Sequence, residues 1–164
     1  MTTRDLIADH VRAEPGVHFN ELVRELDLAP GQTQYHLRRL NVTSEERFGR
    51  THYFPPGYDE WERGALALLR RETAADVVAV LLADGPLSAG ETADSVGIAR
   101  STLSWHRDRL EAAGLVETWP DRGRTLLAVE QPERTARLLD RADPSLPDRL
   151  VDRFTRLVDG LLEG

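Results

Sequence analysis

The chain contains no cysteine and no lysine, and it has no apolar run long enough to cross a membrane. Without cysteine there are no disulfide bonds and no thiolate metal sites. The longest apolar run, around Val77–Ala83, is far shorter than the ~20 residues that span a bilayer. The first residues, Met1–Asp5, lead into a polar amphipathic segment rather than a signal peptide. These absences predict a soluble, cytoplasmic protein, and no residue pattern leads us to expect a cofactor or a metal.

The charge composition is acidic and depends on arginine for its positive charge. Arginine supplies all 21 basic residues, and 28 acidic residues oppose them, for a net charge of −7. This composition resembles that of proteins from salt-adapted haloarchaea; a high-GC genome, which favours arginine codons, is the alternative. An acidic balance weakens attraction to nucleic-acid phosphates. Two segments, residues 29–52 and 99–125, are nevertheless mildly basic, so the charge distribution is compatible with DNA binding.

An internal repeat relates the two halves of the chain. Residues 28–40 align with residues 98–110 at a constant offset, with identical pairs Ala29/Ala99, His36/His106, Arg39/Arg109 and Leu40/Leu110. The same offset pairs Ile7 with Val77 and Val11 with Leu81. Matching apolar positions across a long offset indicate two copies of one supersecondary unit.

Each copy is predicted to contain three helices, with a tight turn before the third, followed by a hairpin. In the first copy we expect helices at residues 3–13, 20–26 (capped by Asn20) and 30–40. In the second, Thr73–Asp76 has the form of a capping box, Ser88 is a good N-cap, and Gly97 suits a left-handed turn. The third helix of that copy is expected at residues 99–113, and the strands at 115–118 and 125–129. In the first copy Asp27 stands where the second has Gly97, and the hairpin glycine follows the helix sooner.

Residues 87–116 resemble the winged helix-turn-helix of ArsR/MarR-type regulators, and the whole chain resembles the tandem winged-helix regulators of haloarchaea. The resemblance implies a mainly α fold with small β wings: two tandem winged helix-turn-helix units plus C-terminal helices. We therefore expect a first unit at residues 1–58, a linker helix at 59–71, a second unit at 72–131, and C-terminal helices at 132–164.

The third helix of such a unit enters the major groove of DNA, and the wing contacts the phosphates or the minor groove. On the second unit Leu103 and Leu110 should face inward with His106 beside them. The predicted DNA-binding residues are those of the opposite helix faces and of the wings: Gln32, Gln34, Tyr35, Arg38, Arg39, Arg47, Arg50, Arg100, Ser101, Thr102, Trp105, Arg109, Arg122 and Arg124. Arginine suits guanine, glutamine suits adenine, and an aromatic ring can contact a thymine methyl.

Each of these residues also has a purely structural interpretation. Tyr35 and Trp105 would then pack against the neighbouring wing, and the helix and wing arginines would be ordinary surface charges. His36 and His106 are interpreted as partly buried structural residues rather than ligands. Arg107 is expected on solvated helix surface or paired with a nearby carboxylate.

The C-terminal segment carries a broad apolar stripe. Ser145–Asp148 has the form of a helix start, and a helical repeat of apolar residues follows: Leu150, Val151, Phe154, Leu157, Val158, Leu161 and Leu162. An isolated helix of this length is marginal in water, so the stripe must be buried. It either folds back on its own chain or forms a homodimer about a two-fold axis, which would match a palindromic operator; we favour the dimer.

The main hypothesis is a sequence-specific, double-stranded-DNA-binding transcription regulator that acts by occupying promoters. The alternative is a winged-helix scaffold for protein interaction in a transcription or chromosome-segregation assembly, where an acidic surface is natural. The sequence has no phosphate-binding loop, dinucleotide glycine motif, H-E-x-x-H or nucleophile constellation, so we do not expect an enzyme. No motif identifies a small-molecule effector.

Overall fold

The computed structural model describes residues 1–142 and divides the chain into two compact units, Met1–Ala67 and Leu68–Gly164. The division falls within the linker helix. The predicted C-terminal stripe, including the dimerisation residues Leu150, Val151, Phe154, Leu157, Val158 and Leu161, lies outside the described residues. Within residues 1–142, no helix has the length and hydropathy needed to cross a bilayer.

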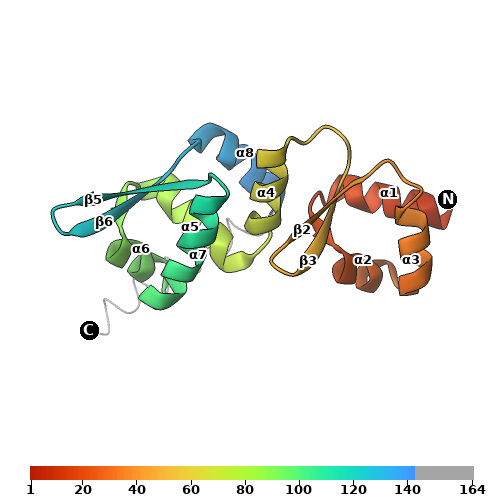
Figure 1. Cartoon of the computed structure of the whole chain (residues 1–164), viewed down its shortest axis with the longest axis horizontal. Coiled ribbons are helices and arrows are strands. Elements are labelled where there is room, and N and C mark those ends of the chain that lie inside the picture. The colour runs from red at the N-terminus through yellow and green to blue at the C-terminus, as the bar shows by residue number, and fades with distance from the viewer. Residues whose placement is uncertain (143–164) are drawn as a thin grey trace. The chain divides into compact units, whose positions relative to one another are not determined.

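The first unit contains three short helices and a three-stranded antiparallel sheet (Figure 1). Its elements are α1 (Thr3–Ala13), β1 (Val17–His18), α2 (Phe19–Leu26), α3 (Pro30–Leu37), β2 (Thr43–Arg47) and β3 (Arg50–Phe54), and the sheet order is β1-β3-β2. Helix α4 (Glu60–Leu69) follows. One cluster of buried side chains joins these elements: Ile7, Val11, Val17, Leu22, Leu37 and Tyr53. Helices α1, α2 and α3 and the sheet therefore share a single core.

The second unit repeats this order (Figure 1). It contains α5 (Glu72–Asp84), β4 (Leu87–Ser88), α6 (Ala89–Val96), α7 (Arg100–Ala112), β5 (Val116–Asp121) and β6 (Arg124–Val129), with sheet order β4-β6-β5, and α8 (Pro132–Ala142) follows β6. Val77 and Leu81 are buried, as are their repeat partners in α1. The mainly α fold with two small β wings that the sequence predicts is confirmed.

Equivalent positions of the repeat stay buried even where the residue type changes. Thr33 of α3 is fully buried where α7 has the buried Leu103, and its hydroxyl donates to the Ala29 carbonyl oxygen at 3.0 Å. Thr92 of α6 likewise replaces Leu22 and donates to the Ser88 carbonyl oxygen at 2.8 Å. A threonine fits these apolar sites because the preceding helical turn satisfies its hydroxyl.

Two predicted helix starts are wrong. Helix α2 begins at Phe19, and its cap is His18, whose Nδ1 accepts a hydrogen bond from the Glu21 amide at 3.3 Å; Asn20 was expected instead. Because β1 pairs with β3, the helix starts directly after the strand. Helix α5 begins at Glu72 with no side-chain cap at Arg71, and Asp76 of the expected capping box is fully buried. Ser88 caps α6 as predicted, accepting from the Glu91 amide at 3.1 Å.

The turn before the third helix has the same backbone in both units. Gly97 has φ 80 and ψ 37, and Asp27 at the equivalent position has φ 52 and ψ 51. Aspartate is one of the few residues besides glycine that adopts this left-handed conformation. The difference in sequence at this position therefore leaves the turn intact.

Both wings close in two-residue turns with positive φ at both positions, Phe48-Gly49 (φ 51 and 77) and Arg122-Gly123 (φ 50 and 79). This is the pattern of the type I′ hairpin turn, which matches strand twist. The second wing has one more strand pair, Val116 with Val129, at its base. Helix α7 is also longer than α3, 13 residues against 8, so the second unit is extended in its third helix as well as in its wing.

Candidate nucleic-acid interface

Helices α3 and α7 each bury one face and expose the other. Leu103 and Leu110 are 1% exposed, as the helical spacing predicts, and Thr33 and Leu37 are the buried residues of α3. Of the predicted helix contacts, Gln34 and Arg109 are partly buried, and the rest are exposed: Gln32, Tyr35, Arg38, Arg39, Arg100, Ser101, Thr102 and Trp105. Each unit thus presents a polar face with one large aromatic ring on it.

Both third helices begin without a side-chain cap. The N-cap residues are Ala29 and Ala99, neither of which makes a side-chain capping bond, and Pro30 occupies the first turn of α3. The amide groups of a first helical turn have no partner inside the helix, and they carry the positive end of its dipole. Two such uncapped ends suit phosphate oxygens.

The aromatic ring on each third helix is stacked against an arginine one turn later. The guanidinium carbon of Arg39 lies 3.5 Å from the ring centroid of Tyr35, and that of Arg109 lies 3.4 Å from the ring centroid of Trp105. Each arginine Nη1 also donates to the carbonyl oxygen of its aromatic residue at 3.1 Å. Tyr35 and Trp105 remain 50% and 43% exposed, so both side chains are accessible to solvent.

The two repeated histidines support these rings from the protein side. His36 lies edge-on to Tyr35 with centroids 5.4 Å apart, and His106 lies edge-on to Trp105 at 4.8 Å. Burial, and then the positive charges of Arg71 and Arg109, lower the pKa of His106 below its ordinary value of 6.5. The shift favours the neutral imidazole, which suits packing against the ring.

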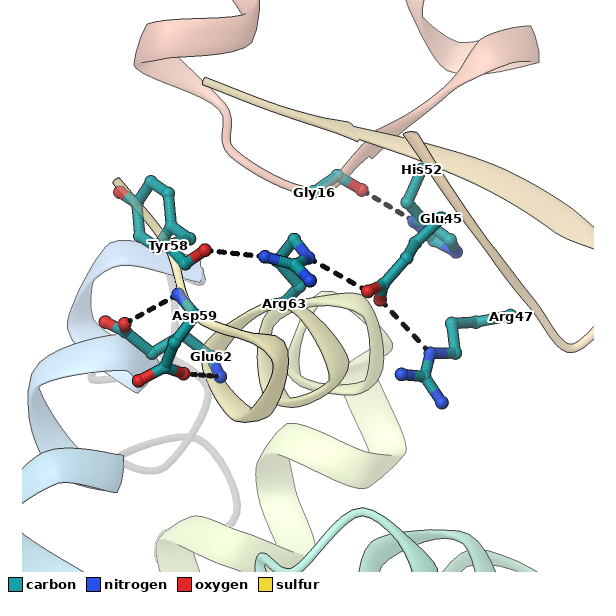
Figure 2. Close-up of polar contacts among 8 residues, drawn as sticks. All are labelled: Gly16, Glu45, Arg47, His52, Tyr58, Asp59, Glu62 and Arg63. Carbon is teal, nitrogen blue, oxygen red and sulfur yellow. Dashed lines mark hydrogen bonds and ion pairs between the residues drawn. The ribbon is translucent and has the colours of Figure 1, made fainter. Parts of the chain in front are cut away.

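Figure 2 shows how the first wing is tied to α4 by a shared carboxylate. The Glu45 carboxylate accepts from Arg63 Nε at 2.9 Å and from Arg47 Nε at 3.3 Å, and Arg63 also donates to the Tyr58 carbonyl oxygen at 2.6 Å. Arg47 also lies against Gly64 of α4. We expected Arg47 to reach DNA from the wing, but its guanidinium is engaged by Glu45 in the structure.

The second wing carries a comparable but more exposed pair. Arg124 Nη1 lies 3.2 Å from a Glu91 carboxylate oxygen, and Arg124 Nη2 lies 3.9 Å from Asp121. Both partners of the Arg124–Glu91 pair are more than half exposed, so this contact is a weak restraint. Arg107, which was not expected to contact DNA, pairs with the adjacent Asp108 at 3.3 Å.

Four predicted contacts keep an unneutralised guanidinium. Within residues 1–142, no ion pair or side-chain hydrogen bond involves Arg38, Arg50, Arg100 or Arg122, and all four are exposed. Arg100 lies directly against Gly90 of α6, where any side chain would collide with its guanidinium. Each unit therefore has one such arginine on its third helix and one on its wing.

Sequence reasoning missed three features of this surface: the Glu45–Arg63 link, the Gly90–Arg100 contact, and the stacking of the two arginines. The stacking had a sequence signal, because an aromatic residue followed four positions later by arginine places both side chains on one helix face. The other two join residues on different elements, and no local pattern identifies such pairs.

Family comparisons match both units. A family model described as an N-terminal HTH domain matches residues 1–66, and one described as a helix-turn-helix domain matches residues 68–118. A comparison with curated protein sequences finds no significant match.

Several solved structures are similar to part of the chain. NolR from Sinorhizobium fredii is 22% identical with a TM-score of 0.46, over 52% of this chain and 83% of NolR. A homodimeric winged helix-turn-helix DNA-binding domain from Mycobacterium bovis is 19% identical with a TM-score of 0.46, over 58% and 93%. A transcriptional regulator from Thermotoga maritima is 22% identical with a TM-score of 0.41, over 63% and 82%. On the strength of the two family matches, the chain contains two helix-turn-helix domains in tandem, and this supports DNA-binding regulation of transcription.

Proposed function

We propose that the protein is a sequence-specific, double-stranded-DNA-binding transcription regulator that acts by occupying promoters. The observation that carries the proposal is the repeated outer face of α3 and α7, each with an uncapped first turn and an arginine that no carboxylate neutralises. A base edge in the major groove is read by such side chains, and phosphates are held by arginines and first-turn amides. The predicted residues of the helices and the wings are the proposed contacts, with Arg47 able to reach phosphate only when it leaves Glu45.

The net charge of −7 limits how much of the affinity can come from phosphate neutralisation. If the protein works at the high salt of a haloarchaeal cytoplasm, screening weakens that term further. We therefore propose that base-edge contacts and apolar burial contribute most of the affinity, and that nonspecific binding is weak.

The test is selection of duplexes from a randomised pool, followed by affinity measurement on the selected site over a range of salt concentrations. Arg100→Ala and Arg38→Ala should each weaken binding to the selected site, and should alter its preferred sequence if they read bases. Arg137→Ala is the matched control, because it removes the same charge from an exposed position on α8. Selection of no duplex, or equal losses in all three variants, would contradict the proposal and favour the protein-interaction scaffold.

We further propose that the stripe formed by Leu150, Val151, Phe154, Leu157, Val158 and Leu161 makes the protein a homodimer. Burial of each such side chain contributes roughly 1.5–3 kcal/mol, and a two-fold axis would pair the helices. A chain truncated at Pro144 should be monomeric in light scattering, whereas the full-length protein should be dimeric. A monomeric full-length protein would refute the dimer, a dimeric truncated chain would refute the role of the stripe, and either result would leave the DNA-binding proposal standing.

A further inference from the structure

The most closely repeated feature of the two units is a three-residue arrangement on the third helix, here called the ring stack: Tyr35, His36 and Arg39 in the first unit, Trp105, His106 and Arg109 in the second. The guanidinium-to-ring distances are 3.5 and 3.4 Å, both Nη1-to-carbonyl distances are 3.1 Å, and both histidines meet the ring at 81°. The geometry is the same although one ring is a phenol and the other an indole.

The ring stack does not depend on how the helix continues. Arg39 lies beyond Leu37, the last residue of α3, and its amide bonds to the His36 carbonyl oxygen. Arg109 lies within α7, which runs on to Ala112. Since the same side-chain geometry forms in both settings, it comes from the arginine and the aromatic ring themselves. Arginine suits this role because its planar guanidinium stacks on a ring while its N–H groups donate in the plane.

In the ring stack the arginine holds the aromatic ring in place, and its guanidinium is occupied by the ring face and a backbone carbonyl oxygen. One ring face is covered by the guanidinium and the histidine ring lies nearly perpendicular beside it, yet Tyr35 and Trp105 are still 50% and 43% exposed. Apart from the Tyr35 hydroxyl and the Trp105 indole N–H, the ring atoms are apolar, and their exposed neighbours on the outer helix faces are polar. In the major groove of a duplex the exposed base edges are hydrogen-bond donors and acceptors, with the thymine C5-methyl as the apolar group. An immobilised ring edge in that groove therefore fits a thymine.

We propose that Tyr35 and Trp105 each bind the C5-methyl group of a thymine, and that Arg39 and Arg109 are positioning residues that hold the rings rather than ligands of phosphate or base. This inference rests on the proposed DNA-binding function and names the base that the same helix face reads. It also reassigns two of the arginines that the sequence placed among the direct contacts.

The first experiment replaces each thymine of the selected duplex by deoxyuridine, which removes only the methyl group. Loss of one buried methyl should weaken binding about fourfold at the thymine that a ring contacts. Trp105→Ala or Tyr35→Ala should remove the discrimination between thymine and uracil at that position. Arg109→Lys should remove it too, because lysine keeps the charge but cannot stack in the same way. Arg107→Lys, two residues away on α7, is the matched control and should retain it.

The possible outcomes distinguish a failure of the thymine-contact inference from a failure of the proposed DNA-binding function. Selective binding that Arg100→Ala weakens, together with equal affinity for thymine and uracil at every position, would overturn the inference and leave the DNA-binding function intact. If Arg109→Lys keeps the discrimination but lowers the salt dependence, Arg109 binds phosphate and its positioning role is wrong. Failure to select any duplex would overturn both proposals.

A second measurement needs no DNA. In a Trp61→Phe/Trp119→Phe background, whose fold is checked by circular dichroism, Trp105 is the sole tryptophan. Arg109→Lys should uncover the indole and raise acrylamide quenching of its fluorescence, whereas Arg107→Lys should leave quenching unchanged. Equal quenching in the parent and in Arg109→Lys would show that the arginine does not hold the ring, and would overturn the positioning role.

Discussion

Glu45 is the residue whose replacement tests most directly how the first wing is held. Its carboxylate lies 2.9 Å from Arg63 Nε and 3.3 Å from Arg47 Nε, and the side chains of Glu45 and Arg63 are only 19% and 21% exposed. Glu45→Gln keeps the size and one acceptor oxygen but removes the charge that both arginines share. We expect the wing to open more easily and Arg47 to be released from its restraint.

The expected cost follows from the burial of the pair. A hydrogen bond to a charged group contributes about 1.5–3 kcal/mol, whereas an exposed ion pair contributes at most about 1 kcal/mol. The Glu45–Arg63 contact lies between these cases, and Arg47 is more exposed at 37%, so its share is small. We therefore expect the free energy of opening to fall by about 1–2 kcal/mol, which corresponds to amide exchange roughly 5–30 times faster in β2 and β3.

Native-state hydrogen exchange of the full chain measures this, with Glu46→Gln as the control. Glu46 is the next residue on β2 and is exposed, and Glu46→Gln changes the net charge by the same amount as Glu45→Gln. On duplex DNA both variants should bind more tightly because both lose a negative charge. Only Glu45→Gln should also steepen the salt dependence, by about 0.9 in the log–log slope, because a freed Arg47 adds one phosphate contact. Indistinguishable exchange rates and slopes for the two variants would refute the reasoning.

Four further substitutions test the turn, the histidine and the glycine beneath Arg100. At Gly97 a new side chain would have open space but would have to adopt the left-handed φ of 80, so Gly97→Ala should lower the free energy of unfolding in urea titration by about 1 kcal/mol. Asp27→Gly, at the equivalent left-handed position, should not lower that free energy, and a destabilised Asp27→Gly variant would contradict this reasoning. Since burial and two arginines lower the pKa of His106, protonation favours the unfolded state, and stability present above pH 6.5 is lost as the pH falls through the lower folded pKa. His106→Gln should therefore flatten the decline of the melting temperature below pH 6.5; an unaltered decline would refute the assignment. Gly90→Ala should leave the melting temperature equal or higher but displace Arg100 and weaken binding to the selected duplex, and unchanged binding would show that the position of Arg100 is unimportant.

The repeat predicted the core because burial is periodic. Ile7, Val11, Val77 and Leu81 recur at one offset on one helix face, and all four are buried in the structure. The turn before the third helix could also be predicted from the sequence, because glycine at position 97 indicates a left-handed backbone conformation. Periodicity and turn chemistry are local properties, so a single sequence carries them.

The errors in helix starts have a different physical origin. Asn20 is a better intrinsic cap than His18, but the pairing of β1 with β3 fixes where α2 can begin. Likewise Thr73–Asp76 has the local form of a cap, yet Asp76 is buried in the body of α5. In both cases contacts with residues distant in sequence decide the start of the helix, and intrinsic preference decides only among the starts that those contacts allow. The Glu45–Arg63 contact, 18 positions apart, was missed for the same reason.

If both units bind DNA as proposed, the positions of the unneutralised arginines predict that the two units read different sequences. Arg38 at the end of α3 aligns with Asp108, and Arg100 at the start of α7 aligns with Pro30. The ring stack, by contrast, occupies the same position in both units. A subsite read by the first unit would thus share a thymine with one read by the second, but its arginine contact would lie at the other end of the helix. We therefore expect the DNA bound by one chain to contain two unequal subsites, which a homodimer would repeat about its two-fold axis, so that Arg38→Ala and Arg100→Ala alter different base positions relative to the two thymines.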